Sequence, residues 1–328
     1  MRAVYIKEFG DLDALEICEI PAPAAPSFQQ VLVNVHAAGL NRADLLQVRG
    51  AYPPPAGYSP NIPGLEFAGR IESVGPDVDR FKIGDRVFGI TSGEAQAEYL
   101  LANVRQVTRI PDNLSFTEAA AVPEAFMTAH DAIFANGHLK EGGTVLIHAV
   151  GSGVGLAALQ LSKAAGALVI GTSRTIEKLD KCRGFGLDHG IRTDGNLDFS
   201  KTVMEITNGH GADVIVDLVG ASYFEMNLRA LAVKGRLILV GLTSGRTTEF
   251  DLGLALQKRA TIIGTVLRAR SADEKADITR LFSDSVVPLL MTGDVAPNVD
   301  KIFPVSEVKE AYQYLGSNRS FGKVVLEF

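Results

Sequence analysis

A glycine-rich turn between an apolar run and a helix-forming run is the segment of this chain best suited to bind a ligand. Residues 143–155 read GTVLIHAVGSGVG, so β-prone residues lead into glycines spaced two apart, and residues 156–163 favour a helix. Backbone N–H groups at the start of such a helix bind phosphate. The order of strand, turn and helix therefore predicts a dinucleotide site. The predicted cofactor contacts in the turn are Ser152, Gly153, Val154 and Gly155.

The turn departs from the strict G-x-G-x-x-G pattern of dinucleotide sites. When the pattern is aligned on Gly155, its first two glycine positions hold Val150 and Ser152. A tight strand-to-helix connection that binds nothing is therefore the plain structural alternative, and the surrounding sequence has to decide between the two.

The end of the next predicted strand indicates which nucleotide would bind. An NAD site places Asp or Glu there, about 20 residues after the glycines, against the ribose 2′-OH. This chain has Ser173 and Arg174 instead, followed by Lys178. Arg192, near the end of a third short strand, is a further candidate. A hydroxyl and several cations suit a 2′-phosphate, so we expect NADPH rather than NADH, unless Arg174 and Lys178 are solvated charges at a helix start.

The second half of the chain alternates between predicted strands and helices. The predicted strands are 144–149, 168–172, 213–218, 236–241 and 261–267, and the predicted helices are 155–165, 177–185, 199–208 and 223–233. Apolar runs such as 214–216 and 237–240 lack a polar face, which is typical of parallel strands covered by helices on both sides. The expected fold class is α/β, a doubly wound parallel sheet of the Rossmann type that binds its ligand at the carboxyl ends of the strands.

The first third of the chain has a different character. It is rich in Pro and Gly, and its short β-prone runs at 31–36, 67–74 and 85–90 predict a partly closed all-β domain. The remaining expectations are a mainly helical stretch at 117–135 interrupted at Pro123, helices at 271–290 and 307–315, and a final strand at 322–328. We expect one domain from 1–122 with 268–328, and a dinucleotide-binding domain from 123–267.

Composition excludes some functions. The chain has 328 residues, of which 21% are charged, and a net charge of −6, which argues against a large nucleic-acid surface. No apolar stretch approaches the ~20 residues of a membrane span, and the N-terminus lacks the apolar core of a signal peptide. The two cysteines, Cys18 and Cys182, are far apart and form no disulfide framework, so we expect a cytoplasmic protein.

Five motifs distributed along the chain resemble the medium-chain dehydrogenase/reductase superfamily. They are LNRADLL at 40–46, YPPP at 52–55, PGLE at 63–66, AVPEA at 121–125 and HAVGSGVG at 148–155. They are most similar to the zinc-free quinone oxidoreductase group that includes zeta-crystallin, and within it to the tumour-suppressor-inducible branch, which resembles this chain in the Ser152 variant of the turn. The resemblance spans essentially the whole chain. It implies a chaperonin-10-like (GroES-like) β-barrel domain, a Rossmann domain and a homodimer joined at the sheet edge formed by 259–266.

The zinc-binding members of this superfamily carry a Cys near positions 41–44 and a Gly-His-Glu triplet. Here the triplet is Gly64-Leu65-Glu66, and leucine cannot ligate zinc, whereas a catalytic zinc needs three protein ligands. We therefore expect no metal, and we expect Glu66 to form an ion pair or hydrogen bond.

The resemblance also implies site residues. Asn41 and Tyr52 match substrate-pocket positions, and the Asn41 amide is also able to bond the nicotinamide ribose. Tyr58 could line the pocket as well, although a half-buried loop anchor is the simpler interpretation. Further cofactor contacts implied by the resemblance are Thr128, Gly241, Leu242, Leu267 and Asn318, with weaker support for Lys323.

These observations lead to one principal hypothesis and two alternatives. A quinone ring stabilises added charge without a Lewis acid, so a metal-free site suits an NADPH-dependent quinone reductase. The first alternative is an NADPH-dependent reductase of enoyl or alkenal C=C bonds, in which Tyr52 would protonate the α-carbon. The second is a binding or structural protein without this activity.

Overall fold

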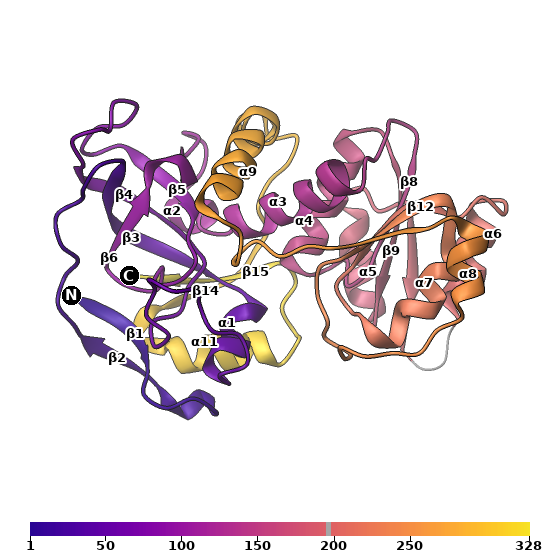
Figure 1. The fold of residues 1–328 in the computed structure, drawn as a ribbon, viewed down its shortest axis with the longest axis horizontal. Coiled ribbons are helices and arrows are strands. Elements are labelled where there is room, and N and C mark those ends of the chain that lie inside the picture. Colours follow the sequence, from indigo (N-terminus) through magenta and orange to yellow (C-terminus); the bar gives the residue numbers. More distant parts are fainter. Residues whose placement is uncertain (195–197) are drawn as a thin grey trace. The chain divides into compact units, whose positions relative to one another are not determined.

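The computed structural model describes residues 1–194 and 198–328 (Figure 1). The chain divides into two compact units. One unit comprises Met1–Met127 together with Leu267–Phe328, and the other comprises Thr128–Val266. We call them the N/C unit and the central unit.

The central unit is built on a six-stranded sheet in the order β10-β9-β8-β11-β12-β13. Its strands are β8 (Thr144–Ile147), β9 (Leu168–Ser173), β10 (His189–Arg192), β11 (Ala212–Asp217), β12 (Leu231–Leu239) and β13 (Thr261–Gly264). All neighbouring strands are parallel. The chain runs outward from β8 to β10 and then returns to β11 on the other side of β8. The strand order therefore reverses between β8 and β11, where Rossmann folds bind dinucleotides.

Helices cover both faces of this sheet. The helices are α4 (Gly153–Ala164), α5 (Ile176–Arg183), α6 (Phe199–Ile206), α7 (Phe224–Ala230) and α8 (Leu252–Lys258), together with the π-helix η3 (Asp131–Asn136) and the short η4 (Ala221–Tyr223). One apolar cluster joins Leu146, Ile170 and Ile215 of the sheet to Phe199 of α6 and Leu228 of α7. Figure 1 shows α4 on the opposite side of the strands from α7 and α8. The predicted doubly wound α/β sheet is confirmed.

Several boundaries in this unit differ from the sequence prediction. The helix predicted over 223–233 ends at Ala230, because Leu231 takes an extended conformation and pairs with Ala212 as the first residue of β12. β12 ends at Leu239 rather than at Gly241, because the N–H groups of Val240 and Gly241 both donate to the Asp217 carbonyl at the end of β11. β13 likewise ends at Gly264, three residues before the predicted limit.

A buried polar chain ties the strands together beside the glycine turn. His148 Nδ1 lies 2.9 Å from Thr172 Oγ1, and its Nε2 lies 2.6 Å from Asn227 Oδ1. Asn227 Nδ2 in turn donates to Asp217 Oδ2 at 3.0 Å. Burial lowers the pKa of His148, so a neutral imidazole links β9, β11 and α7 at the point where the turn begins.

The N/C unit is a β-structure that returns to its first strands at the end of the chain. A sheet in the order β14-β15-β3-β4-β5-β7 is joined by β6, which also pairs with β3, and β1 and β2 form a separate antiparallel pair. The strands are β1 (Arg2–Ile6), β2 (Leu15–Glu19), β3 (Gln30–Leu40), β4 (Glu66–Val74), β5 (Arg86–Ile90), β6 (Tyr99–Asn103), β7 (Val107–Arg109), β14 (Val299–Pro304) and β15 (Lys323–Glu327). β3 alternates buried Val31, Val33 and Val35 with less buried residues, because one face of the strand lies on the core.

Helices complete the N/C unit. They are α1 (Arg42–Val48), α2 (Phe116–Ala119), α9 (Ala272–Ser285), α10 (Val287–Thr292) and α11 (Val308–Gly316), with short helices η1 (Leu12–Ala14), η2 (Val104–Gln106) and η5 (Val305–Glu307). The helix α3 (Pro123–His130) begins in this unit, at the proline where an interruption was predicted. The single helix predicted over 271–290 is two helices, because Pro288 starts a new first turn and lacks the N–H that a continuous helix needs. Within residues 1–194 and 198–328, none of the helices has the length and apolar character needed to cross a membrane.

Candidate active site

The glycine turn of the central unit leads directly into a capped helix. Ser152 is the N-cap of α4, and its Oγ accepts a hydrogen bond of 3.1 Å from the Gly155 N–H. A Cβ on Gly155 would lie 2.5 Å from the Ala149 carbonyl oxygen, so only glycine lets the helix pack this closely on the end of β8. The serine that replaces a glycine of the strict pattern thus acts as a cap, while the last glycine keeps its packing role.

Three of the residues predicted for a 2′-phosphate lie together. Ser173 is the last residue of β9, and it pairs with Arg192, the last residue of β10. Arg174 follows directly and is exposed, whereas Ser173 is buried. Arg192 forms an ion pair with Asp194, and Lys178 stands half-buried in the first part of α5. The hydroxyl and the cations therefore lie at the carboxyl ends of two adjacent strands, as the sequence predicts.

The other predicted cofactor contacts are dispersed over the two units. Gly241 and Leu242 follow β12, and Leu242 is 48% exposed. Thr128 is half-buried at the start of the central unit. Leu267 and Asn318 belong to the N/C unit, where Asn318 follows α11 with a φ of 61°. The roles of these five residues stay predictions.

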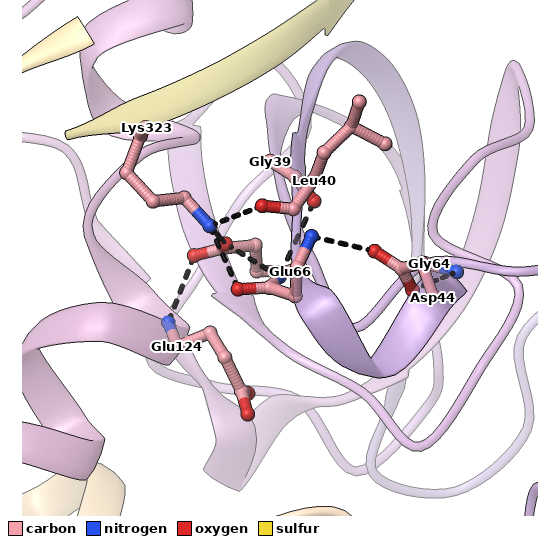
Figure 2. Close-up of polar contacts among 8 residues, drawn as sticks. Gly39, Leu40, Asp44, Gly64, Glu66, Glu124 and Lys323 are labelled. Carbon is pink, nitrogen blue, oxygen red and sulfur yellow. Dashed lines mark hydrogen bonds and ion pairs between the residues drawn. The ribbon is translucent and has the colours of Figure 1, made fainter. Parts of the chain in front are cut away.

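The N/C unit contains a buried charge cluster, formed by Asn41, Asp44, Glu66, Glu124 and Lys323 (Figure 2). Glu66 is fully buried and Lys323 is 6% exposed, and Lys323 Nζ donates to Glu66 Oε1 at 2.6 Å. The same ammonium group donates to the Leu40 carbonyl and to Asn41 Oδ1, both at 2.7 Å. The expected ion pair of Glu66 is confirmed. Lys323 uses its three donors within this cluster, which is a different role from the cofactor contact that the resemblance implied.

Local backbone structure explains how the cluster forms. β3 ends at Leu40 and α1 begins at Arg42, so Asn41 lies between them with its amide Nδ2 donating to Glu66 Oε1 at 2.9 Å. A Cβ on Gly39 would lie 2.4 Å from Glu66 Oε1, so glycine at this position makes room for the carboxylate. The Asn41 amide is thus engaged through both its oxygen and its nitrogen.

Asp44 fixes the backbone on both sides of the cluster. Its carboxylate accepts a hydrogen bond of 2.7 Å from the Asn41 N–H and one of 3.3 Å from the Gly64 N–H. Burial raises the pKa of Asp44 to about 6, although the hydrogen bond from Asn41 and the charge of Lys323 oppose this shift. Asp44 therefore joins the two segments that carry Asn41 and Glu66.

Glu124 is bound to the cluster through its backbone. Its N–H donates to Glu66 Oε2 at 2.8 Å. Burial, followed by the negative charge of Glu66, raises the pKa of Glu124 to about 8. A glutamate in the first turn of a helix is ordinarily favoured as a carboxylate, so here the surroundings outweigh the helix dipole.

Tyr52 is positioned by a buried arginine that the sequence analysis did not identify. Arg268 is 3% exposed, and its Nη1 donates to the Tyr52 carbonyl at 2.7 Å while its guanidinium lies 5.1 Å from the centre of the Tyr52 ring. Arg268 also donates to Gln47 Oε1 at 2.5 Å and to the Ser92 carbonyl at 2.8 Å. Burial raises the pKa of Tyr52, so its phenol remains a donor at neutral pH.

A second buried cation, Lys275, lies beside Arg268. Its ammonium donates to the Arg268 carbonyl at 2.8 Å and to Ser92 Oγ. No pattern in residues 267–275 distinguishes Arg268 and Lys275 from solvated charges, because Ser92, which both side chains contact, is far away in the sequence. Tyr58 is half-buried beside Gly93, consistent with a loop anchor. Among the described residues, no group of three or more His, Cys, Asp or Glu side chains is placed to hold a metal ion.

Two family models match successive parts of the chain. Residues 27–130 match the family model "Alcohol dehydrogenase GroES-like domain", and residues 153–283 match "Zinc-binding dehydrogenase". A quinone oxidoreductase of Pseudomonas aeruginosa is 32% identical over 327 residues, which cover 99% of this chain and 99% of the relative.

Two solved structures show the same fold over the whole chain. The Escherichia coli quinone oxidoreductase complexed with NADPH superimposes with a TM-score of 0.90 at 27% identity, covering 100% of both chains. The CurK enoyl reductase superimposes with a TM-score of 0.88 at 26% identity, covering 99% of this chain and 98% of that one. The capped glycine turn, the paired strand ends and the full-length similarity lead to one conclusion: the chain belongs to the quinone oxidoreductase family of the medium-chain dehydrogenase/reductase superfamily, and it is an oxidoreductase.

Proposed function

We propose that this protein is an NADPH-dependent quinone reductase that transfers a hydride to small quinones without a metal ion. The observation that carries the proposal is the pairing of Ser173 with Arg192 at the ends of β9 and β10, beside Arg174. A hydroxyl and cations at this position suit a phosphate on the adenosine ribose better than a free 2′-OH. The relative solved with NADPH has the same fold.

The residues of the central unit fit such a cofactor. The start of α4 offers backbone N–H groups and a partial positive charge to a pyrophosphate, and the Gly155 position leaves no side chain at the tight approach to β8. When bound, NADPH supplies the hydride.

The N/C unit contributes groups suited to an organic acceptor. The Tyr52 ring and phenol offer a surface for stacking and a hydrogen-bond donor, and Arg268 holds the loop that carries them. The Asn41 amide is held in a fixed orientation by Glu66 and Lys323. The Tyr52 phenol is the donor that positions a carbonyl oxygen without a Lewis acid, whereas the Asn41 amide already donates to Glu66 Oε1.

Steady-state kinetics with a panel of acceptors test the proposal. With NADPH, we expect turnover of 1,2-naphthoquinone and 1,4-benzoquinone at rates well above those with crotonyl thioesters or 2-alkenals. The alternative, a C=C reductase, is supported by the similarity to the CurK enoyl reductase. Turnover of the thioesters or alkenals alone would establish that alternative instead, and a failure to bind NADPH at micromolar concentrations would exclude both.

Removal of metal ions should leave the activity intact. Leu65 precedes Glu66, at the place where zinc-binding relatives have a histidine ligand, and Lys323 supplies the positive charge next to Glu66. We expect substoichiometric zinc in the purified protein and an unchanged rate after treatment with a chelator. One zinc per chain, together with loss of activity in chelator and recovery on adding zinc, would contradict a metal-free reaction.

We also propose that two chains join along β13 into a homodimer. β13 is the edge of the six-stranded sheet. Ile262 on this strand is 39% exposed, and Val266, two residues past its end, is 52% exposed. In α8, which packs on β12, Leu252 and Leu256 are 74% and 78% exposed. An uncovered apolar edge favours association, and the measurement that tests it is the mass of the protein in solution.

A further inference from the structure

We propose that the Glu124 carboxyl group is the proton donor to the organic acceptor. This inference rests on the proposed function, because a proton donor is needed only if an acceptor is reduced. Glu124 belongs neither to the glycine turn nor to the pair of predicted pocket residues, Asn41 and Tyr52.

The backbone and the side chain of Glu124 have different surroundings. The backbone N–H is fixed by the 2.8 Å hydrogen bond to Glu66 Oε2. Figure 2 shows the side chain of Glu124 directed away from the Glu66 carboxylate, with no contact drawn to its own carboxyl group. Within the part of the chain that the structure describes, no residue forms a hydrogen bond or ion pair with this carboxyl group, and the residue is mostly but not completely buried. Glu124 therefore presents a free carboxyl group from a rigid backbone.

The surroundings keep this carboxyl group protonated. Several charged or titratable groups act on it from the elements packed around it: Glu66 of β4, Asp44 of α1, Lys323 of β15, Lys275 of α9, Arg268, and the Tyr52 phenol. Burial and the negative charges of Glu66 and Asp44 outweigh the cations, and the pKa of Glu124 rises to about 8. The group is then mostly neutral at pH 7 and carries an O–H that it can donate.

The chemistry of the proposed reaction requires such a donor. The acceptor gains a hydride, that is two electrons and one proton, from the cofactor and becomes an oxyanion. The Glu124 O–H bond then breaks, the proton forms a new O–H bond on the acceptor, and the Glu124 carboxylate later recovers a proton from water. A phenol-like oxyanion has a conjugate-acid pKa of about 10, so the transfer from a group with a pKa of about 8 is favourable.

The hydrogen bonds of Glu66 support the same assignment. Glu66 accepts from the Asn41 amide at Oε1 and from the Glu124 N–H at Oε2, so Glu124 lies next to a predicted pocket residue. Burial, followed by the negative charge of Glu124, raises the pKa of the Tyr52 phenol. Tyr52, with its pKa raised above that of an ordinary phenol, is the poorer acid of the two. It is suited to orient the acceptor while Glu124 supplies the proton.

The test is the variant Glu124→Gln, which keeps the backbone N–H and the shape of the side chain but removes the acidic proton. We expect kcat for quinone reduction to fall by about 100-fold or more, as is typical when a general acid is lost. The dissociation constant of NADPH should remain within about twofold of that of the unmodified protein. Glu72→Gln, an exposed position on the same strand as Glu66, is the matched control and should retain full activity.

The pH profile separates a catalytic from a structural role. In the unmodified protein, kcat should fall as pH rises through about 8, where Glu124 loses its proton, and this alkaline decrease should be absent from the residual activity of Glu124→Gln. Glu124→Gln should also melt at a higher temperature than the unmodified protein at pH 9, and the difference should shrink at pH 5. The reason is that the pKa of Glu124 is higher in the folded protein, about 8, than in the unfolded chain, about 4.5. The folded protein therefore loses stability as pH rises from about 4.5 to about 8, and the Gln variant does not.

Three results would overturn the assignment. They are full activity of Glu124→Gln, an alkaline decrease that persists unchanged in the variant, and a flat profile between pH 7 and 9 in the unmodified protein. The last measurement needs no variant, so it remains decisive if Glu124→Gln does not fold. In contrast, an unmodified protein that binds NADPH but reduces no acceptor would contradict the proposed function itself, before Glu124 is tested.

Discussion

Replacing Lys323 with methionine is expected to destabilise the N/C unit by about 3–5 kcal/mol, the range found when one partner of a buried ion pair is removed. The substitution keeps most of the apolar volume but removes the charge that lies 2.6 Å from the fully buried Glu66 carboxylate. The Leu40 carbonyl and Asn41 Oδ1 each lose a donor as well. Urea unfolding monitored by circular dichroism measures the loss.

The double variant Lys323→Met with Glu66→Gln distinguishes electrostatics from packing. If the uncompensated charge of Glu66 causes the damage, the double variant should recover a large part of the lost stability, because a neutral amide needs no counter-charge. Equal destabilisation of the single and double variants would show that Lys323 contributes through packing and hydrogen bonds alone.

The parts of the fold that were predicted correctly are those with a local signal. Continuous apolar runs such as 214–216 and 237–240 identify buried parallel strands, and Pro123 marks the start of α3. The boundary at Leu231 was missed because residues 231–233 fit a helix by their types, and only pairing with Ala212 makes them a strand. Tertiary pairing of this kind cannot be read from a single segment.

In the candidate site too, the residues that were predicted correctly have a local signal, and those that were missed have distant partners. The glycine turn and the cations after β9 lie within a few residues of each other, so their spacing alone is informative. In the buried charge cluster, Lys323 Nζ meets Glu66, which lies 257 positions earlier, and Arg268 meets Gln47, 221 positions earlier. Glu124 forms part of a recognisable motif, but its free carboxyl group becomes apparent only once Glu66 is placed beside it.

Replacing Arg174 with alanine should weaken NADPH binding by about 10- to 100-fold and leave NADH binding within about twofold. A charged hydrogen bond contributes about 1.5–3 kcal/mol, and 1.4 kcal/mol corresponds to a factor of ten. Arg174 follows Ser173 at the end of β9, next to the paired Arg192 on β10, so it is an exposed cation at the predicted position of the 2′-phosphate. NADH lacks that phosphate. Fluorescence titration with each coenzyme measures both constants without requiring an acceptor.

Arg183→Ala provides the matched control, because it removes the same charge from the far end of α5, where Arg183 is exposed and lies 3.2 Å from Asp180. A purely long-range effect of net charge would weaken NADPH binding similarly in both variants, whereas a direct contact affects Arg174→Ala alone. Equal losses for NADPH and NADH in Arg174→Ala would remove Arg174 from the 2′-phosphate site. The discrimination between the coenzymes would then have to come from Ser173, Lys178 and Arg192.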